Sequence, residues 1–114
     1  MLVRSRIEEM AHLRSQLVRR LKKLGVEDRA LPGREDGFSS LLYGGKEFAH
    51  FHDDNELDIR LTRNVINREG LAHPTYSRVH ANRSKNSQWI EVRFENAADL
   101  ERLVRLVKLA IEQI

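Results

Sequence analysis

Histidine is the residue of this 114-residue chain with the most chemistry to offer, because the chain has five histidines and no cysteine. Two of them, His50 and His52, are separated by one residue in a stretch where polar and apolar side chains alternate. Alternate residues of a β-strand point to the same side of a sheet, so both imidazoles are expected on one face. Imidazole titrates near neutral pH and also ligates metals, so the pair can support acid–base chemistry or a metal site.

Two kinds of site fit this pair. In the first, His50 or His52 acts as a general base and Arg60 stabilises developing negative charge or holds an anion. In the second, His50 and His52 bind a divalent ion together with Asp58, His73 or His80, since two histidines and one carboxylate can bind non-haem iron and three histidines suit zinc. A neighbouring Arg60 would repel a cation. We therefore predict catalytic roles for His50, His52 and Arg60 without a cofactor, and keep a divalent metal and a plain solvent-facing sheet surface as alternatives.

The remaining candidates lie in and after residues 71–87, a segment that shows no periodicity. A connection of this length in a compact domain is usually functional or disordered, and this one can fold over a neighbouring sheet face. Its two histidines would close the site, and an indole on the polar side of the next strand would form an aromatic wall, as in many small-molecule pockets. The predicted ligand-binding residues are Asp58, His73, His80, Trp89 and Glu91.

Hydrophobic periodicity predicts the elements that must position these residues. Apolar spacings of three and four predict helices, and strict alternation predicts strands. Residues 26–37 are expected to form a connector. This pattern indicates a two-layer α+β domain, in which an antiparallel-rich, four-stranded sheet is covered on one face by long N- and C-terminal helices. The predicted elements are a helix at 7–24, strands at 38–43, 46–52 and 56–61, a short helix at 63–69, a strand at 88–94, and a helix after Asn96.

Turn chemistry predicts how the strands pair. Gly44 and Gly45 suit a two-residue hairpin loop, because both positions can adopt positive φ. A second turn is expected at 53–55. The predicted opposed pairs are Phe38–Phe51, Ser39–His50, Ser40–Ala49, Phe51–Leu57 and His52–Glu56.

This register decides which side chains share a face. The predicted core face carries Phe38, Leu42, Ala49, Phe51, Leu57, Ile59, Leu61, Ile90, Val92 and Phe94. The predicted polar face carries Ser39, Leu41, Tyr43, Phe48, His50, His52, Asp58, Arg60, Trp89, Glu91 and Arg93.

The charge balance restricts the partners. Twenty basic and 17 acidic residues give a net charge of +3, which is modest for a nucleic-acid-binding protein. Nucleic acid is therefore only an alternative partner, through the basic loop residues Arg78, Arg83 and Lys85. No apolar run approaches the ~18 residues that span a bilayer, so we expect no membrane partner. The N-terminus has no hydrophobic segment typical of secretion signals, which predicts a cytoplasmic protein.

The order of several short motifs resembles the luciferase domain family, a group of small bacterial proteins related to the fungal luciferases. The resemblance covers roughly residues 30–112 and rests on five segments. It implies that the four histidines of these segments occupy family motif positions. The fungal members oxidise a hispidin-type pyrone with molecular oxygen and emit light. The segments are Glu47–His52, Leu57–Leu61, Gly70–Pro74, His80 and Ser87–Ile90.

Together these observations predict a single domain over residues 1–114, with a helix and connector at 1–29 before the family-like region at 30–112. The leading functional prediction is binding of a small, anionic or enolisable organic ligand in a pocket lined by His, Arg and Trp, with acid–base or oxygen chemistry that needs no cofactor. A non-catalytic homodimer is the alternative, because Leu106 and Leu109 flank the apolar stripe of the C-terminal helix. Whether the protein is an enzyme stays open.

Overall fold

The computed structural model describes residues 5–73 and 83–114. Within these residues the chain forms helices and strands in the order α1 (Arg6–Lys22), β1 (Glu27–Ala30), β2 (Ser39–Tyr43), β3 (Lys46–Asp53), β4 (Glu56–Arg60), α2 (Arg63–Arg68), β5 (Trp89–Arg93) and α3 (Ala97–Glu112). The strands form one antiparallel sheet in which the spatial order equals the chain order.

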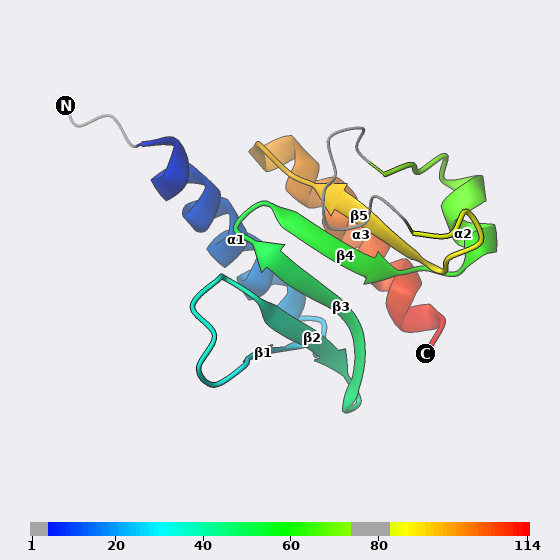
Figure 1. The fold of residues 1–114 in the computed structure, drawn as a ribbon, viewed down its shortest axis with the longest axis horizontal. Helices are drawn as coiled ribbons and strands as arrows, with labels where there is room; N and C mark the ends of the chain where they lie inside the picture. Colours follow the sequence, from blue (N-terminus) through cyan, green and yellow to red (C-terminus); the bar gives the residue numbers. More distant parts are fainter. Residues whose placement is uncertain (1–4, 74–82) are drawn as a thin grey trace.

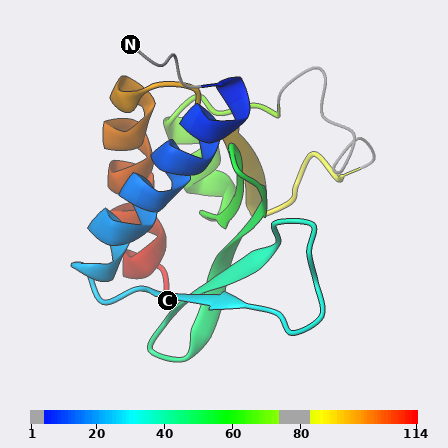
Figure 2. The same ribbon diagram turned by 90° about the vertical axis from the view of Figure 1, so that its left-hand side faces the viewer.

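The long helices α1 and α3 cover one face of the sheet (Figure 1). The view turned by 90° shows them side by side as one layer, with the sheet as the second layer (Figure 2). Ser5 caps α1 by accepting a hydrogen bond from the backbone of Glu8, and Asn96 caps α3 in the same way at Asp99. The predicted two-layer α+β fold is confirmed.

The sheet has a fifth strand, β1, where the sequence predicted a connector and a four-stranded sheet. The sequence Glu-Asp-Arg-Ala of β1 has no apolar alternation, and three of its four residues are exposed. Because β1 is an edge strand that pairs only with β2, nothing requires one of its faces to be apolar. The usual strand signal is therefore absent.

The β2–β3 hairpin begins as predicted and then changes register. Gly44 and Gly45 have positive φ, and Tyr43 lies opposite Lys46. Farther along, Phe48 has no partner on β2, and this bulge shifts all later pairs by one residue. The bulge places the Phe48 side chain in the hydrophobic core. Three predicted pairs are consequently wrong, and the observed pairs are Ser39–Phe51, Ser40–His50 and Leu41–Ala49.

The shifted register exchanges the faces of the residues in and before β2. Leu41 was predicted on the polar face but is fully buried in the core. The hydroxyl of Ser39 hydrogen-bonds to Arg14 of α1 and to Asp28 of β1. Phe38, predicted in the core, stacks instead on the ring of His50.

The second turn also differs from the prediction at 53–55, because Asp53 pairs with Glu56 and leaves a two-residue turn. His52 therefore lies at an irregularity in the β3–β4 ladder rather than opposite Glu56. The predicted pair of Phe51 and Leu57 is confirmed. Between β4 and β5 the register sets Ile59 opposite Ile90 and Leu57 opposite Val92 on the covered face.

The outer face of the same strands carries the predicted polar residues. Asp58 lies opposite Glu91, and Arg60 lies opposite Trp89. His50 is the β3 partner of Asp58. A row of polar residues therefore crosses three adjacent strands on the side away from α1 and α3.

Candidate functional site

His50 is held in one orientation by a buried carboxylate. Its Nε2 atom lies 3.1 Å from Oδ2 of Asp58, and the Asp58 side chain is only 1% exposed. Because an ionised carboxylate only accepts hydrogen bonds, the N–H of Nε2 donates to Asp58. Nδ1 is buried and has no hydrogen-bond partner among the described residues, and Oε1 of Glu47 lies 3.7 Å from it.

Arg83 neutralises the carboxylate that holds His50. Its two terminal nitrogens lie 2.6 and 2.9 Å from Oδ1 and Oδ2 of Asp58, which is a bidentate pair. A buried carboxylate is costly unless it is paired and hydrogen-bonded, so Arg83 makes the burial of Asp58 tolerable. The sequence analysis considered Arg83 only as an alternative nucleic-acid contact in a basic loop, whereas the structure pairs it with Asp58. Arg78, the predicted companion of Arg83, lies outside the described residues.

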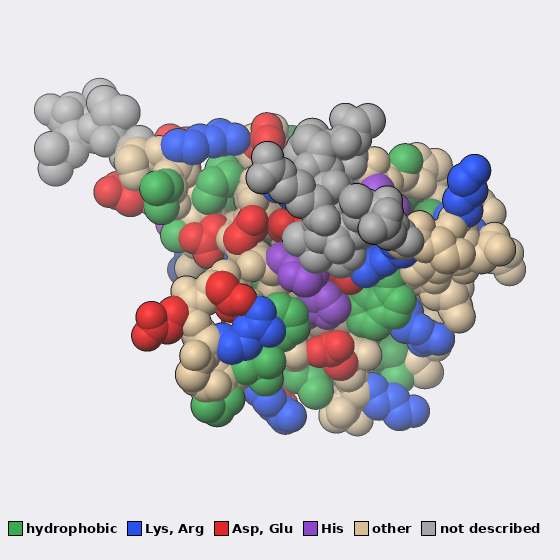
Figure 3. Space-filling model, viewed as in Figure 1, with side chains coloured by type: hydrophobic (Ala, Val, Ile, Leu, Met, Phe, Trp, Pro, Cys, Tyr) green, Lys and Arg blue, Asp and Glu red, His purple; other side chains and the backbone are tan. Residues whose placement is uncertain are grey.

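Aromatic rings flank the His50 imidazole. The ring of Phe38 stacks at 5.1 Å between centroids, and the ring of Trp89 stacks at 5.3 Å, both within about 30° of parallel. His52 meets the same imidazole edge-on at 4.8 Å. The space-filling view shows the histidines gathered on the open sheet face, beside acidic and apolar side chains (Figure 3). The predicted aromatic wall at Trp89 therefore lies against His50, as does Phe38, which the sequence analysis missed.

A second group of charged residues, on β4 and β5, is buried beside Asp58. Glu91 is 1% exposed and Glu56 is 3% exposed. Arg93 joins them, with its Nε 2.9 Å from Glu91 and a terminal nitrogen 3.2 Å from Glu56. Burial, a hydrogen bond to Glu91 and the repulsion of that carboxylate raise the pKa of Glu56 to about 7. Glu56 therefore exchanges a proton near neutral pH.

Burial also keeps two of the histidines neutral. It lowers the pKa of His52, with a further contribution from His50, and it lowers the pKa of His73, with a further contribution from Arg83. Nδ1 of His73 accepts a hydrogen bond of 3.3 Å from the backbone of Glu91, so this imidazole sits at the outer edge of β5. His80, the other histidine predicted to close the site, lies outside the described residues.

Three of the predicted residues could hold a metal ion. His50, His52 and Asp58 each offer a donor atom, and these atoms lie within 4.8 Å of one another. Two neutral imidazoles and one carboxylate are a suitable donor set for several divalent metals. Arg83 already binds both oxygens of Asp58, however, and its positive charge competes directly with a cation.

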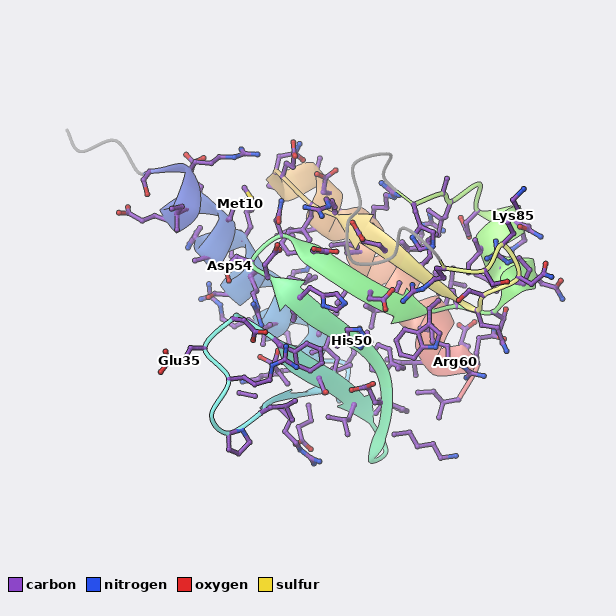
Figure 4. The ribbon with its side chains drawn as sticks, viewed as in Figure 1. Met10, Glu35, His50, Asp54, Arg60 and Lys85 are labelled. Carbon is purple, nitrogen blue, oxygen red and sulfur yellow. The ribbon has the colours of Figure 1, made fainter. Side chains whose placement is uncertain are left out.

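Arg60 stands apart from this cluster. It ends β4, opposite Trp89, and its side chain forms no hydrogen bond or ion pair with any residue that the structure describes. The stick view shows it toward the far end of β4 from His50 (Figure 4). The guanidinium of Arg60 therefore lies beside an indole and is available to bind an anion.

Sequence reasoning missed Phe38, Glu56 and Arg83 as members of the cluster. Glu56 could have been found, because it alternates with Asp58 and Arg60 in β4. Arg83 carried no local signal, since its partner is 25 residues away.

The predicted dimer surface is largely used within the chain. Leu106 is fully buried, and Leu109 packs against the core. The dimer itself stays a prediction. Among the helices of residues 5–73 and 83–114, none has both the length and the apolar composition needed to cross a bilayer.

Comparison with protein-family models gives one match, to the luciferase domain, over residues 45–110. The chain belongs to the luciferase domain family. The match covers more than half of the sequence, and within the luciferase domain it includes all the clustered residues described above except Phe38. No curated protein and no solved structure matches this chain.

Proposed function

We propose that the outer sheet face of this luciferase domain binds a small, enolisable organic anion and that His50 is the general base that removes its proton. The observation that carries the proposal is the fixed imidazole. Asp58, clamped by Arg83, orients Nε2, while Phe38 and Trp89 hold the ring between them. A general base works best when its orientation and tautomer are set before the ligand arrives.

The other groups on this face support recognition of an anion. Arg60 has no partner within the described part of the chain and lies beside Trp89, so it can hold a carboxylate or enolate while the ligand ring packs on the indole. The fungal luciferases to which this family is related oxidise a hispidin-type pyrone. A hydroxypyrone is an enolisable anion of the proposed class, which makes it a suitable probe.

Proton exchange tests the proposal directly. The ring C–H beside the hydroxyl-bearing carbon of a hydroxypyrone exchanges when a base removes a proton from this carbon in the keto tautomer, and this exchange is followed by ¹H NMR in D₂O, with and without protein. We expect the wild-type protein to accelerate exchange, and the variant His50→Ala to lose about 10²–10⁴-fold of that acceleration, which is the usual contribution of a general base. Arg60→Ala should weaken binding of the pyrone more than it slows exchange at saturation.

His12→Ala is the matched control, because His12 is an exposed histidine of α1 on the covered side of the sheet. It should exchange the pyrone proton at the wild-type rate. Exchange that is no faster with wild-type protein than with free imidazole at equal concentration would contradict the proposal, and so would a His50→Ala variant that retains full acceleration.

A metal site is the second candidate, because the donor atoms of His50, His52 and Asp58 lie so close together. Cobalt(II) absorption spectra separate the two candidates. If the native site works without a metal, the Arg83→Gln variant should bind cobalt more tightly than the wild-type protein, because the guanidinium no longer occupies both oxygens of Asp58. Stoichiometric, His50-dependent uptake by the wild-type protein would instead establish the metal site.

A further inference from the structure

Two neighbouring hollows lie along α3 on the helical layer, remote from the histidine cluster. The larger, of about 540 Å³, lies between α1 and α3, and the smaller, of about 390 Å³, adjoins it along α3. Arg20 and Glu101 line both hollows, so the two form one continuous depression. We call it the helical groove.

Cations from two distant parts of the sequence line the helical groove. Six of its lining residues are basic and one, Glu101, is acidic, whereas the whole chain has a net charge of only +3. Glu101 is paired with Arg20 at 3.0 Å. The six cations are Arg19, Arg20 and Lys23 of α1 and Arg102, Arg105 and Lys108 of α3.

Most of these cations form no ion pair within the described part of the chain. Arg105 pairs with Glu69 at 3.0 Å, as Arg20 does with Glu101. The other four cations are exposed and form no ion pair with any residue in 5–73 or 83–114. Concentrated positive charge in a concave surface raises the local potential and attracts an anionic partner. The four are Arg19, Lys23, Arg102 and Lys108.

The lining of the helical groove indicates which anion fits. Its lining also includes the apolar residues Ala97, Leu100 and Val104, of which Ala97 is exposed. None of the lining residues is aromatic, so the groove has no platform on which nucleic-acid bases could stack. Arginine forks pair with carboxylates in a bidentate manner. Several carboxylates that pair with these cations, together with small apolar contacts, are what an acidic peptide supplies.

We propose that the helical groove docks an acidic segment of a partner protein, one in which glutamate or aspartate alternates with apolar residues. The groove is lined by residues of α1 and α3, which form one layer against the sheet (Figure 2), whereas the histidine cluster belongs to the sheet face turned away from these helices. Docking there leaves the outer sheet face open, so the two activities can be tested independently.

Fluorescence anisotropy with a labelled peptide rich in glutamate and interspersed leucine tests the proposal. We expect saturable binding that weakens as salt is added. Reversal of the four unpaired cations, in the variant Arg19→Glu, Lys23→Glu, Arg102→Glu, Lys108→Glu, should lower the affinity at least about tenfold. The milder variant Arg102→Gln, Lys108→Gln should lower it by a smaller factor, and circular dichroism should show that both variants keep the native fold.

The matched control is Lys46→Glu, Lys85→Glu, which reverses two exposed cations outside the groove and should leave the affinity unchanged. A folded Arg102→Gln, Lys108→Gln variant that binds the peptide as tightly as wild type would overturn the proposal. So would the absence of saturable binding to wild type, or tighter binding to polyuridylate or to phosphatidylglycerol vesicles than to the peptide.

Discussion

Both faces of the sheet contain fully buried side chains, but their burial is stabilised by different means. On the face under α1 and α3, Phe51, Leu57 and Ile59 are enclosed by other apolar side chains. On the outer face, Asp58 and Glu91 are just as inaccessible but carry ionisable groups. Apolar burial is favourable in itself, whereas burial of a carboxylate depends on its partners. Loss of side-chain volume on the covered face should therefore lower the free energy of unfolding, and on the outer face the loss of an ion-pair partner should do so.

The largest effect is expected on the covered face. Phe51→Ala should lower the free energy of unfolding by about 3–5 kcal/mol, because it removes a fully buried ring and leaves a cavity. Guanidinium denaturation followed by Trp89 fluorescence measures the loss. Phe51→Leu should cost clearly less, since it keeps most of the volume. Equal losses in the two variants would show that volume is not what this face depends on.

An intermediate effect is expected where Asp58 meets Arg83. Asp58→Asn and Arg83→Gln should each lower the free energy of unfolding by about 1.5–3 kcal/mol, since each removes a charge-assisted, part-buried interaction. The double variant should cost little more than either single one, because the second change removes a partner that is already lost.

The pair of Glu69 and Arg105 supplies the control for this cycle. Here a single terminal nitrogen of Arg105 lies 3.0 Å from both carboxylate oxygens of Glu69, and Arg105 is largely exposed to solvent. Its coupling energy should stay below about 1 kcal/mol. If the Asp58–Arg83 cycle gives an equally small value, the outer face does not depend on its charge pairs.

The smallest effect concerns the pH dependence that Glu56 adds to the outer face. Its pKa is about 7 in the folded chain and 4.5 when unperturbed. The folded state therefore binds this proton more tightly, so the contribution of Glu56 to stability is complete below pH 4.5 and is lost as the pH rises through about 7. Glu56→Gln cannot ionise, and the difference in unfolding free energy between variant and wild type should shift in favour of the variant over that interval.

Denaturation curves measured from pH 5 to pH 8, at intervals of half a pH unit, would detect this shift. The difference in unfolding free energy should change by at most ~1.4 kcal/mol for each unit by which the pKa of Glu56 is raised. His52 and His73 titrate in both proteins and cancel in the difference. A difference that is constant with pH would show that Glu56 stays ionised in the folded state.

The sequence by itself determined the local elements and the composition of each strand. Spacings of three and four apolar residues sufficed for α1 and α3, because a helix that covers a sheet needs one apolar stripe. The Gly44–Gly45 turn followed from the freedom of glycine to adopt positive φ. The alternation in β4 and β5 correctly separated Ile59 and Ile90 from Asp58 and Glu91. In these cases the information lies within a few neighbouring residues.

Only the tertiary structure decided how these elements combine. The bulge at Phe48 inverted the expected faces of Phe38 and Leu41, because the large Phe48 ring is more stable in the core than on the polar side of the hairpin. The strand β1 forms because an edge of the sheet accepts its backbone, whatever its side chains. Arg83 pairs with Asp58 because the fold brings a remote loop to a buried charge that must be neutralised. Each outcome depends on packing or charge between distant residues, which a local pattern does not contain.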